Sequence, residues 1–209
     1  SRKTSRRGDW QGRPAPPMVP AMPMMSRTIL LAALVFPVSA AAEGADNVVM
    51  VELFTSQGCS SCPPADETLA ALADRHDVLA LALHVDYWDY LGWHDTFAKS
   101  EHTLRQADYR DKLNGRVLFT PQMIVNGTAS VPAIRDDAVE DAIEAAAETP
   151  LAAGIEIDRE AGMLEAEITG EVRQPSTIWV ASYDKEATVD IERGENAGRT
   201  ITYRNIVEK

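Results

Sequence analysis

The feature that most constrains the fold is the stretch from Val48 to Glu67. A β-branched apolar run leads through a short polar turn to Cys59 and Cys62, and an amphipathic segment follows. This order predicts a strand that delivers a dithiol to the first turn of a helix. The free N–H groups of that turn and the positive end of the helix dipole favour a thiolate over a thiol. We therefore expect Cys59, at the cap, to be the nucleophile and Cys62, one turn in, to be the resolving thiol. Pro63 and Pro64 are consistent with a helix that begins here, because the first turn of a helix tolerates proline.

The N-terminal residues predict an exported protein. Residues 1–24 are rich in proline and arginine, and we expect them to be a disordered or spurious extension. Residues 25–42 contain a basic residue, an apolar run and several small residues, which is the layout of a cleavable signal peptide. The alternative is a membrane anchor, but the apolar run is shorter than the roughly 20 residues that span a bilayer, and Pro37 interrupts it. We expect a periplasmic or secreted protein that is not attached to a membrane after cleavage.

The remaining chain is strongly acidic. Residues 43–209 contain 14 Lys and Arg against 31 Asp and Glu, a net charge of −17, whereas the full chain carries −12. Such a surface is repelled by nucleic acid and by anionic lipid. We therefore expect no nucleic-acid partner and attribute the acidity to solubility.

The cysteine count indicates redox chemistry. Cys59 and Cys62 are the only cysteines, and export places them where disulfides persist. The alternative is a disulfide with a purely structural role. A four-residue loop, however, gives about 2 kcal/mol by the chain-entropy estimate, against about 3 kcal/mol for fifteen residues. A redox function of the cysteine pair is the better interpretation, and it needs no cofactor.

The periodicity of the rest of the chain predicts an α/β body over residues 43–150 and a β-rich unit over 151–209. In the body, helical spacing and apolar runs alternate. We expect helices at 66–76, 96–113 and 134–148, a strand at 78–85, and a hairpin from the strands 122–125 and 128–131. After Pro150 apolar and polar residues alternate with period two, as in an antiparallel sheet with one solvent-exposed face. The expected strands there are 154–158, 163–168, 177–183, 188–192 and 199–203.

Four stretches together resemble a known family: residues 51–66, 84–93, 119–127 and 194–203. They are similar to a bacterial family of secreted thioredoxin-like proteins, labelled as a domain of unknown function (number 1223). The resemblance implies an α/β, thioredoxin-like fold with an appended antiparallel β unit. Family members usually continue past the segment that corresponds to Val207, so the resemblance also implies that this unit is truncated here.

The resemblance further implies that Thr120-Pro121 is the cis-proline loop of such a fold. A cis X–Pro bond can turn the backbone of residue 120 towards the sulfur of Cys59, where it can pair with an extended substrate peptide. The residues alone favour a trans proline at the start of a strand.

Glu52 is a candidate proton acceptor, as a buried carboxylate. It lies on the strand that leads to the dithiol, and thioredoxins use an acid near that place to accept the proton of the resolving thiol. The alternative is a charge on the solvent face of the sheet.

A second group of polar residues follows the strand at 78–85, and it comprises His84, Asp86, Asp89, His94 and Asp95 among several aromatic residues. One interpretation is a metal site, with or without the thiols. We favour the other, a loop beside the dithiol whose acids cap the next helix, with Asp95 as that cap. The aromatic residues, Trp88 among them, then offer a platform for a peptide, and no metal is expected.

These observations predict a thiol–disulfide oxidoreductase that acts on protein or peptide disulfides or on a redox partner. Two alternatives stay open. One is a non-catalytic binding module with a thioredoxin fold and a dormant disulfide. The other is a copper-handling protein that uses Cys59, Cys62 and His84. The sequence makes no prediction of the oligomeric state.

Overall fold

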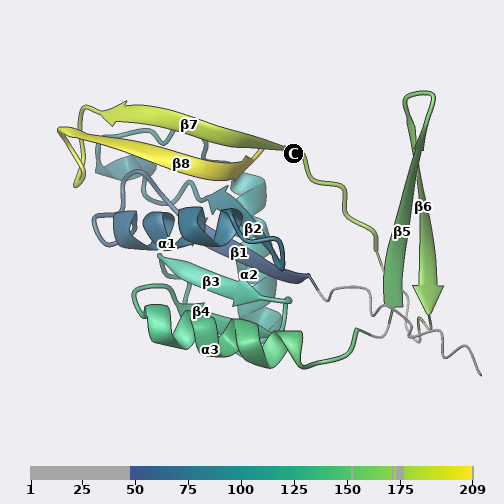
Figure 1. Cartoon of the computed structure of the whole chain (residues 1–209). Helices are drawn as coiled ribbons and strands as arrows, with labels where there is room; N and C mark the ends of the chain where they lie inside the picture. The colour runs from purple at the N-terminus through teal and green to yellow at the C-terminus, as the bar shows by residue number, and fades with distance from the viewer. Residues whose placement is uncertain (1–47, 152, 171, 173–176, 209) are drawn as a thin grey trace, which may run out of the picture. The chain divides into compact units, whose positions relative to one another are not determined.

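The structure, a computed structural model, describes residues 48–151, 153–170, 172 and 177–208. The expected extension over 1–24 and the expected signal peptide over 25–42 lie outside the described residues. The described chain has a mixed α/β fold (Figure 1). None of its described helices has both the length and the apolar content that crossing a membrane requires. The elements in chain order are β1 (Val49–Thr55), α1 (Pro63–Ala73), β2 (Val78–His84), η1 (Asp89–Leu91), α2 (Ser100–Lys112), β3 (Gln122–Val125), β4 (Ala129–Pro132), α3 (Asp136–Ala147), β5 (Ala153–Glu160), β6 (Met163–Gly170), β7 (Tyr183–Ile191) and β8 (Arg199–Val207).

The main sheet has six strands in the order β4-β3-β1-β2-β8-β7. β1 and β2 are parallel, and β2 and β8 are parallel, whereas the remaining pairs are antiparallel. The continuous apolar run of β2 suits this position, because residues of α1 and α3 cover one face of the strand and Tyr109 of α2 packs on the other. The predicted helices and strands of the α/β body are present within a few residues of their expected ends.

The alternation of β1 divides the core into two clusters. Val51 and Leu53 pack on one side of the sheet with residues of α1 and α3. Phe54 packs on the other side with Tyr109 of α2, their rings 6.2 Å apart. Successive side chains of a strand point to opposite faces, so Glu52 lies on the α2 side and Thr55 on the α1 side.

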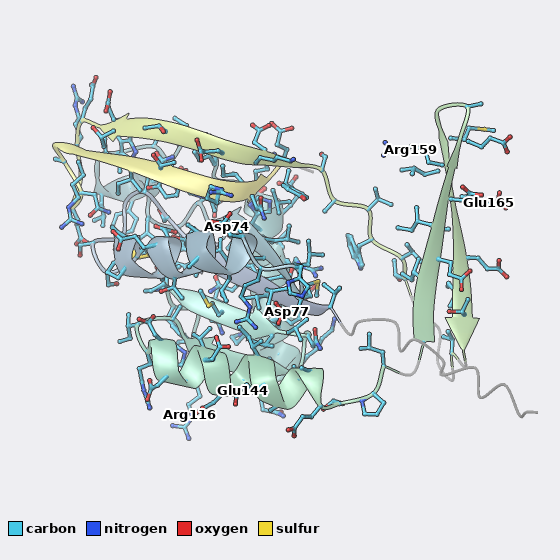
Figure 2. All side chains as sticks on the ribbon, in the orientation of Figure 1. Asp74, Asp77, Arg116, Glu144, Arg159 and Glu165 are labelled. Carbon is cyan, nitrogen blue, oxygen red and sulfur yellow. A yellow bond between two sulfur atoms is a disulfide. The ribbon has the colours of Figure 1, made fainter. Side chains whose placement is uncertain are left out.

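The C-terminal strands differ from the expected single appended unit, because β7 and β8 belong to the main sheet. Tyr203, Ile206 and Val207 of β8 are buried, which exceeds what a strand with one wet face would bury. Arg204 of β8 also donates a hydrogen bond of 2.8 Å to Asp74. Asp74 lies just after α1 (Figure 2). The apolar strand β2 needs a second neighbour, and β8 supplies it.

β5 and β6 form a separate two-stranded antiparallel sheet. The strand expected over 177–183 is wrong, since residues 177–182 pair with no strand among the described residues and β7 begins at Tyr183. Its apolar residues Trp179 and Val180 are 76% and 80% exposed, so apolar alternation there does not correspond to burial.

Candidate functional site

The site is built around a disulfide between Cys59 and Cys62. The two sulfurs are 2.11 Å apart, and the pair lies between the end of β1 and the start of α1. The predicted passage from strand to dithiol to helix is therefore confirmed. The expected placement of Cys59 at the helix cap is wrong, because α1 begins at Pro63 and Cys62 is its N-cap. Cys59 lies in the preceding turn, where its carbonyl accepts the N–H of Cys62 at 3.2 Å.

The amide donors expected in the first turn of α1 are not free. Pro63 and Pro64 have no N–H group. The N–H groups of Ala65 and Asp66 both donate to the carbonyl of Cys62, at 2.9 and 3.0 Å. The first four residues of α1, all of them described, thus leave no free N–H for a sulfur. What remains for Cys59 is the helix dipole and the Ser61 hydroxyl, whose oxygen lies 3.4 Å from its sulfur.

Both cysteines are fully buried, at 0% exposure, although Ser60 and Ser61 between them are exposed. An incoming thiol therefore reaches either sulfur only after a local movement of the protein.

The loop between β7 and β8 contacts the turn that carries the two cysteines, residues 56–62, here called the dithiol turn. Asn196 is buried, and its amide nitrogen donates to the carbonyls of Gln57 and Cys59 at 2.9 and 2.8 Å. The adjacent Glu195 accepts the N–H of Ser60 at 3.1 Å. The sequence assigned no role to these residues, because only the fold brings a loop some 135 positions away onto the cysteines.

The segment after β2 also contacts the dithiol turn. The N–H of Gln57 donates to Asp95 at 2.7 Å, and the indole of Trp93 donates to the Gln57 side chain at 2.8 Å. A Cβ atom added to Gly58 would lie 3.1 Å from that of Trp88, so the two residues are in close contact. The prediction of a loop beside the dithiol is thus confirmed.

Trp88 links this loop to the segment of Thr120 and Pro121. Its indole N–H donates to the Thr120 hydroxyl at 2.8 Å. The Thr120–Pro121 peptide bond is cis, as the resemblance implied, and it directly precedes β3. The structure therefore brings Thr120 to Trp88, which in turn contacts Gly58, while their role in substrate binding stays a prediction.

Glu52 is not placed beside the dithiol. It is 2% exposed, and its carboxylate accepts hydrogen bonds from Arg105 at 2.6 Å and from Tyr109 at 2.5 Å, both on α2. The alternation of β1 turns it away from α1 and hence from Cys62. The expected burial of Glu52 is therefore confirmed, and the alternative of a charge on the solvent face is wrong.

The acids and histidines after β2 form separate pairs. His84 pairs with Asp95 at 2.8 Å in the interior, and His94 pairs with Asp89 at 2.5 Å near the surface. Asp86 accepts a hydrogen bond from Thr103 at 2.6 Å. Across the described ranges, no three such side chains are grouped to hold a metal ion.

The expected role of Asp95 as the cap of α2 is wrong, because α2 begins at Ser100. Its carboxylate instead accepts the N–H groups of Gln57 and Phe97. Burial alone would raise the pKa of Asp95, but His84 and these N–H groups outweigh burial and lower it. Asp95 thus carries a negative charge in the interior.

A buried polar group lies beneath this loop, and the sequence did not reveal it. Asp66 of α1 is 4% exposed, and Thr55 donates to one of its oxygens at 2.8 Å. Burial raises the pKa of Asp66 to about 7, an effect that His84 and Thr55 only partly oppose. The ring of His84 lies 4.9 Å from that of Tyr203, whose pKa is raised by burial and by the carboxylates of Asp66 and Asp95. An acid in the first turns of a helix is usually read as a capping charge, so no sequence signal marked Asp66 as an interior residue.

Comparison with known proteins places the sequence in a family. A family model described as "Protein of unknown function (DUF1223)" matches residues 50–209. A protein of Agrobacterium tumefaciens with a crystal structure is 36% identical, with a TM-score of 0.67 over 77% of this chain and 70% of that chain. No protein with a curated description matches. This chain therefore belongs to the family of proteins of unknown function DUF1223.

Proposed function

We propose that the protein is an exported, thioredoxin-like thiol–disulfide oxidoreductase. Two features support a thioredoxin-like arrangement. The parallel strands β1 and β2 are joined through α1, and the β3–β4 hairpin before α3 begins directly after the cis Thr120–Pro121 bond. The family match supports the resemblance from which this proposal started, although the family itself has no assigned activity.

The observation that carries the proposal is the disulfide between residues three positions apart at the junction of β1 and α1. A bridge that closes so short a loop stabilises the fold by only about 2 kcal/mol in the chain-entropy estimate. The same spacing allows one sulfur to displace a partner from the other, which is what thiol–disulfide exchange requires.

The exchange proceeds in two steps. The Cys59 thiolate attacks a substrate disulfide, an S–S bond forms between them, and the substrate's other sulfur leaves as a thiolate. The Cys62 thiolate then attacks the Cys59 sulfur, the Cys59–Cys62 bond forms, and the second substrate thiolate leaves. The substrate gains two electrons, the protein dithiol loses two, and the reverse sequence oxidises a substrate dithiol.

The proposed substrates are protein or peptide disulfides, or a redox partner protein, in the periplasm or outside the cell. The disulfide fits an oxidising compartment, where such bonds persist. The edge formed by Trp88 and Thr120 beside Gly58 is the proposed place for an extended peptide, because it joins an aromatic surface to backbone next to the dithiol turn.

The second candidate is a binding module with a dormant disulfide. The complete burial of both sulfurs favours it, because a buried disulfide is shielded from incoming thiols. The two candidates differ in whether the dithiol turn opens.

The test uses the reduced protein and insulin as a disulfide substrate. The wild type is expected to reduce insulin in the presence of a small-molecule thiol, and a Cys59→Ala variant is expected to lose this activity. A Cys62→Ala variant is expected to accumulate a covalent complex with insulin that a reductant releases, whereas the double variant forms none. A reduced wild type that leaves insulin intact, with no complex in the Cys62→Ala variant, would establish the binding module instead.

A further inference from the structure

Three buried polar atoms, on Asp66 and on two residues that interact with it electrostatically, have no hydrogen-bond partner among the described residues. They are the second carboxylate oxygen of Asp66, Nε2 of His84 and the hydroxyl of Tyr203. They come from α1, β2 and β8, and all three residues are at most 4% exposed. Native proteins leave few such groups, and those that occur often belong to functional sites.

The three groups have complementary chemistry. The Tyr203 hydroxyl is a donor, the Asp66 oxygen is an acceptor when ionised, and Nε2 of His84 can take either role. His84 is fixed from its other side, because Nδ1 pairs with Asp95 at 2.8 Å. The edge of its ring packs against Tyr203, with the centroids 4.9 Å apart. Asp66 can therefore hold a proton without leaving the interior.

Asp66 is adjacent to the resolving cysteine along α1. Its N–H donates to the carbonyl of Cys62 at 3.0 Å, so the two residues are one helical turn apart on the same side of α1. Side chains on a helix lean towards its N-terminus, and one oxygen of the Asp66 carboxyl contacts the Thr55 hydroxyl at the end of β1, the strand that leads to the dithiol. Both residues are buried, so water does not compete for the proton.

Several charged or titratable groups face Asp66. They are His84 from β2, Asp95 from the following loop, Tyr203 from β8 and Glu67 from α1 itself. Burial has the largest effect and raises the pKa of Asp66 to about 7, with His84 opposing it and the two other carboxylates reinforcing it. The carboxyl thus changes its charge near neutral pH, where a proton acceptor is most effective.

We propose that Asp66 exchanges the proton of Cys62 during thiol–disulfide exchange, with His84, held by Asp95, and Tyr203 setting the charge of Asp66. This inference rests on the proposed function. Asp66 takes the proton from the Cys62 thiol, and the resulting thiolate attacks the Cys59 sulfur of the mixed disulfide. The Cys59–Cys62 bond forms, and the substrate sulfur leaves with the electron pair of the broken bond. In the reverse direction the protonated Asp66 returns the proton to Cys62.

Asp66 fits this role better than the expected Glu52. Glu52 lies on the α2 side of β1, and both of its oxygens accept hydrogen bonds, from Arg105 and Tyr109. Asp66 is a residue of α1, the helix that Cys62 caps, and one of its oxygens has no partner among the described residues.

The test follows the reaction of the reduced protein with Ellman's reagent in a stopped-flow instrument. The first release of coloured thiolate reports modification of Cys59, and the second reports displacement by Cys62. In Asp66→Asn the first phase is expected to keep its rate, while the second slows at least about tenfold at pH 7. The rate of the second phase is also expected to lose the increase that the wild type shows as the pH rises through about 7. Asp66→Glu is expected to restore part of the second phase. Glu67→Gln is the matched control, because it removes the neighbouring exposed carboxyl of the same helix turn. Of the groups that act on the pKa of Asp66, Glu67 has the smallest effect, so both phases are expected to stay close to their wild-type rates.

Two further results decide the proposal. An unchanged second phase in Asp66→Asn, or an equal slowing in Glu67→Gln, would overturn the role of Asp66 and leave the proposed function standing. A wild type that releases no thiolate in either phase would overturn both.

Infrared spectra of the oxidised protein give an independent measurement. A carboxyl band that titrates near pH 7 and is missing in Asp66→Asn is expected. If no such band exists, the proposal is wrong whatever the kinetics, since Asp66 then does not change its charge near neutrality.

Discussion

Asn196 shows how a single side chain can control access to the dithiol. Its amide group bonds two carbonyls of the dithiol turn, those of Gln57 and Cys59, from a loop that is distant in the sequence. With Asn196 in place, the turn is held over both sulfurs, which are buried. Release of these two bonds would remove the contacts that Asn196 makes with the turn and leave those of Glu195 and Asp95.

Replacing Asn196 by aspartate is expected to loosen the turn. The variant loses both donors and places a carboxylate oxygen against two carbonyls, so we expect a loss of about 1–3 kcal/mol in the free energy of unfolding. We also expect faster reduction of the disulfide by dithiothreitol. Asn205→Asp is the matched control, because Asn205 donates a comparable bond of 2.8 Å to the carbonyl of Ala80 away from the cysteines. Equal reduction rates in the two variants would mean that Asn196 does not hold the turn.

Glu52 is expected to matter for stability and not for exchange. In Glu52→Gln, the ion pair with Arg105 and the bond from Tyr109 are weakened in a buried place, which we expect to cost about 1–3 kcal/mol. Denaturant unfolding measures this loss. The second phase of the stopped-flow reaction is expected to keep its wild-type rate, and a slower second phase would return Glu52 to the role that its position in the sequence suggested.

At the scale of elements, the start of α1 limits how strongly the helix can stabilise a thiolate. The two prolines at its first positions lack the N–H groups that a helix terminus normally offers to an anion. The dipole of α1 is therefore left to act on Cys59 without direct donors from its first four residues.

Restoring one donor is expected to make Cys59 more reactive. Pro64→Ala adds a free N–H at an exposed position of the first turn. A stabilisation of about 0.3–1 kcal/mol for the thiolate corresponds to a roughly two- to fivefold higher rate of alkylation by iodoacetamide at pH 7. Pro132→Ala, at an exposed position of β4, is the control and is expected to leave the rate unchanged. A rate in Pro64→Ala equal to that of the control would show that amides of α1 do not act on the sulfur.

For the whole molecule, the buried Asp66 is expected to make stability depend on pH. Burial raises its pKa in the folded protein to about 7, from an ordinary value of 3.8. Between about pH 4 and pH 7 the folded protein holds a proton that the unfolded chain has released, so stability falls as the pH rises. Three pH units correspond to about 4 kcal/mol.

The comparison of wild type with Asp66→Asn isolates this effect. The variant is expected to gain stability relative to wild type as the pH rises from 4 to 8, as measured by urea unfolding, and Glu67→Gln is expected to show no such gain. Asp95, whose pKa is lowered, contributes stability that is lost as the pH falls, but it is present in all three proteins and cancels. A constant difference between wild type and Asp66→Asn would contradict the raised pKa.

The local patterns of the sequence predicted most elements of the α/β body and the disulfide, because spacing and turn residues encode them directly. The placement of β8 beside β2 was not predictable, since alternation does not say which sheet a strand joins. The same limit applies to the site. Thr120 followed from the resemblance and Trp88 from the aromatic residues after β2, whereas Asn196 reaches the dithiol only through tertiary packing. The burial of Asp66 is likewise a result of packing, and Glu52 is turned away by the face of β1 on which it lies.

The reduction potential of the Cys59–Cys62 pair tests the central claim most directly. It is obtained by equilibrating the protein with glutathione buffers, trapping the free thiols and counting them by mass spectrometry. An exchange-active pair is expected between about −270 and −120 mV, the range of known dithiol oxidoreductases. A value below about −300 mV, typical of structural disulfides, would contradict the proposed exchange activity and identify the pair as a structural disulfide.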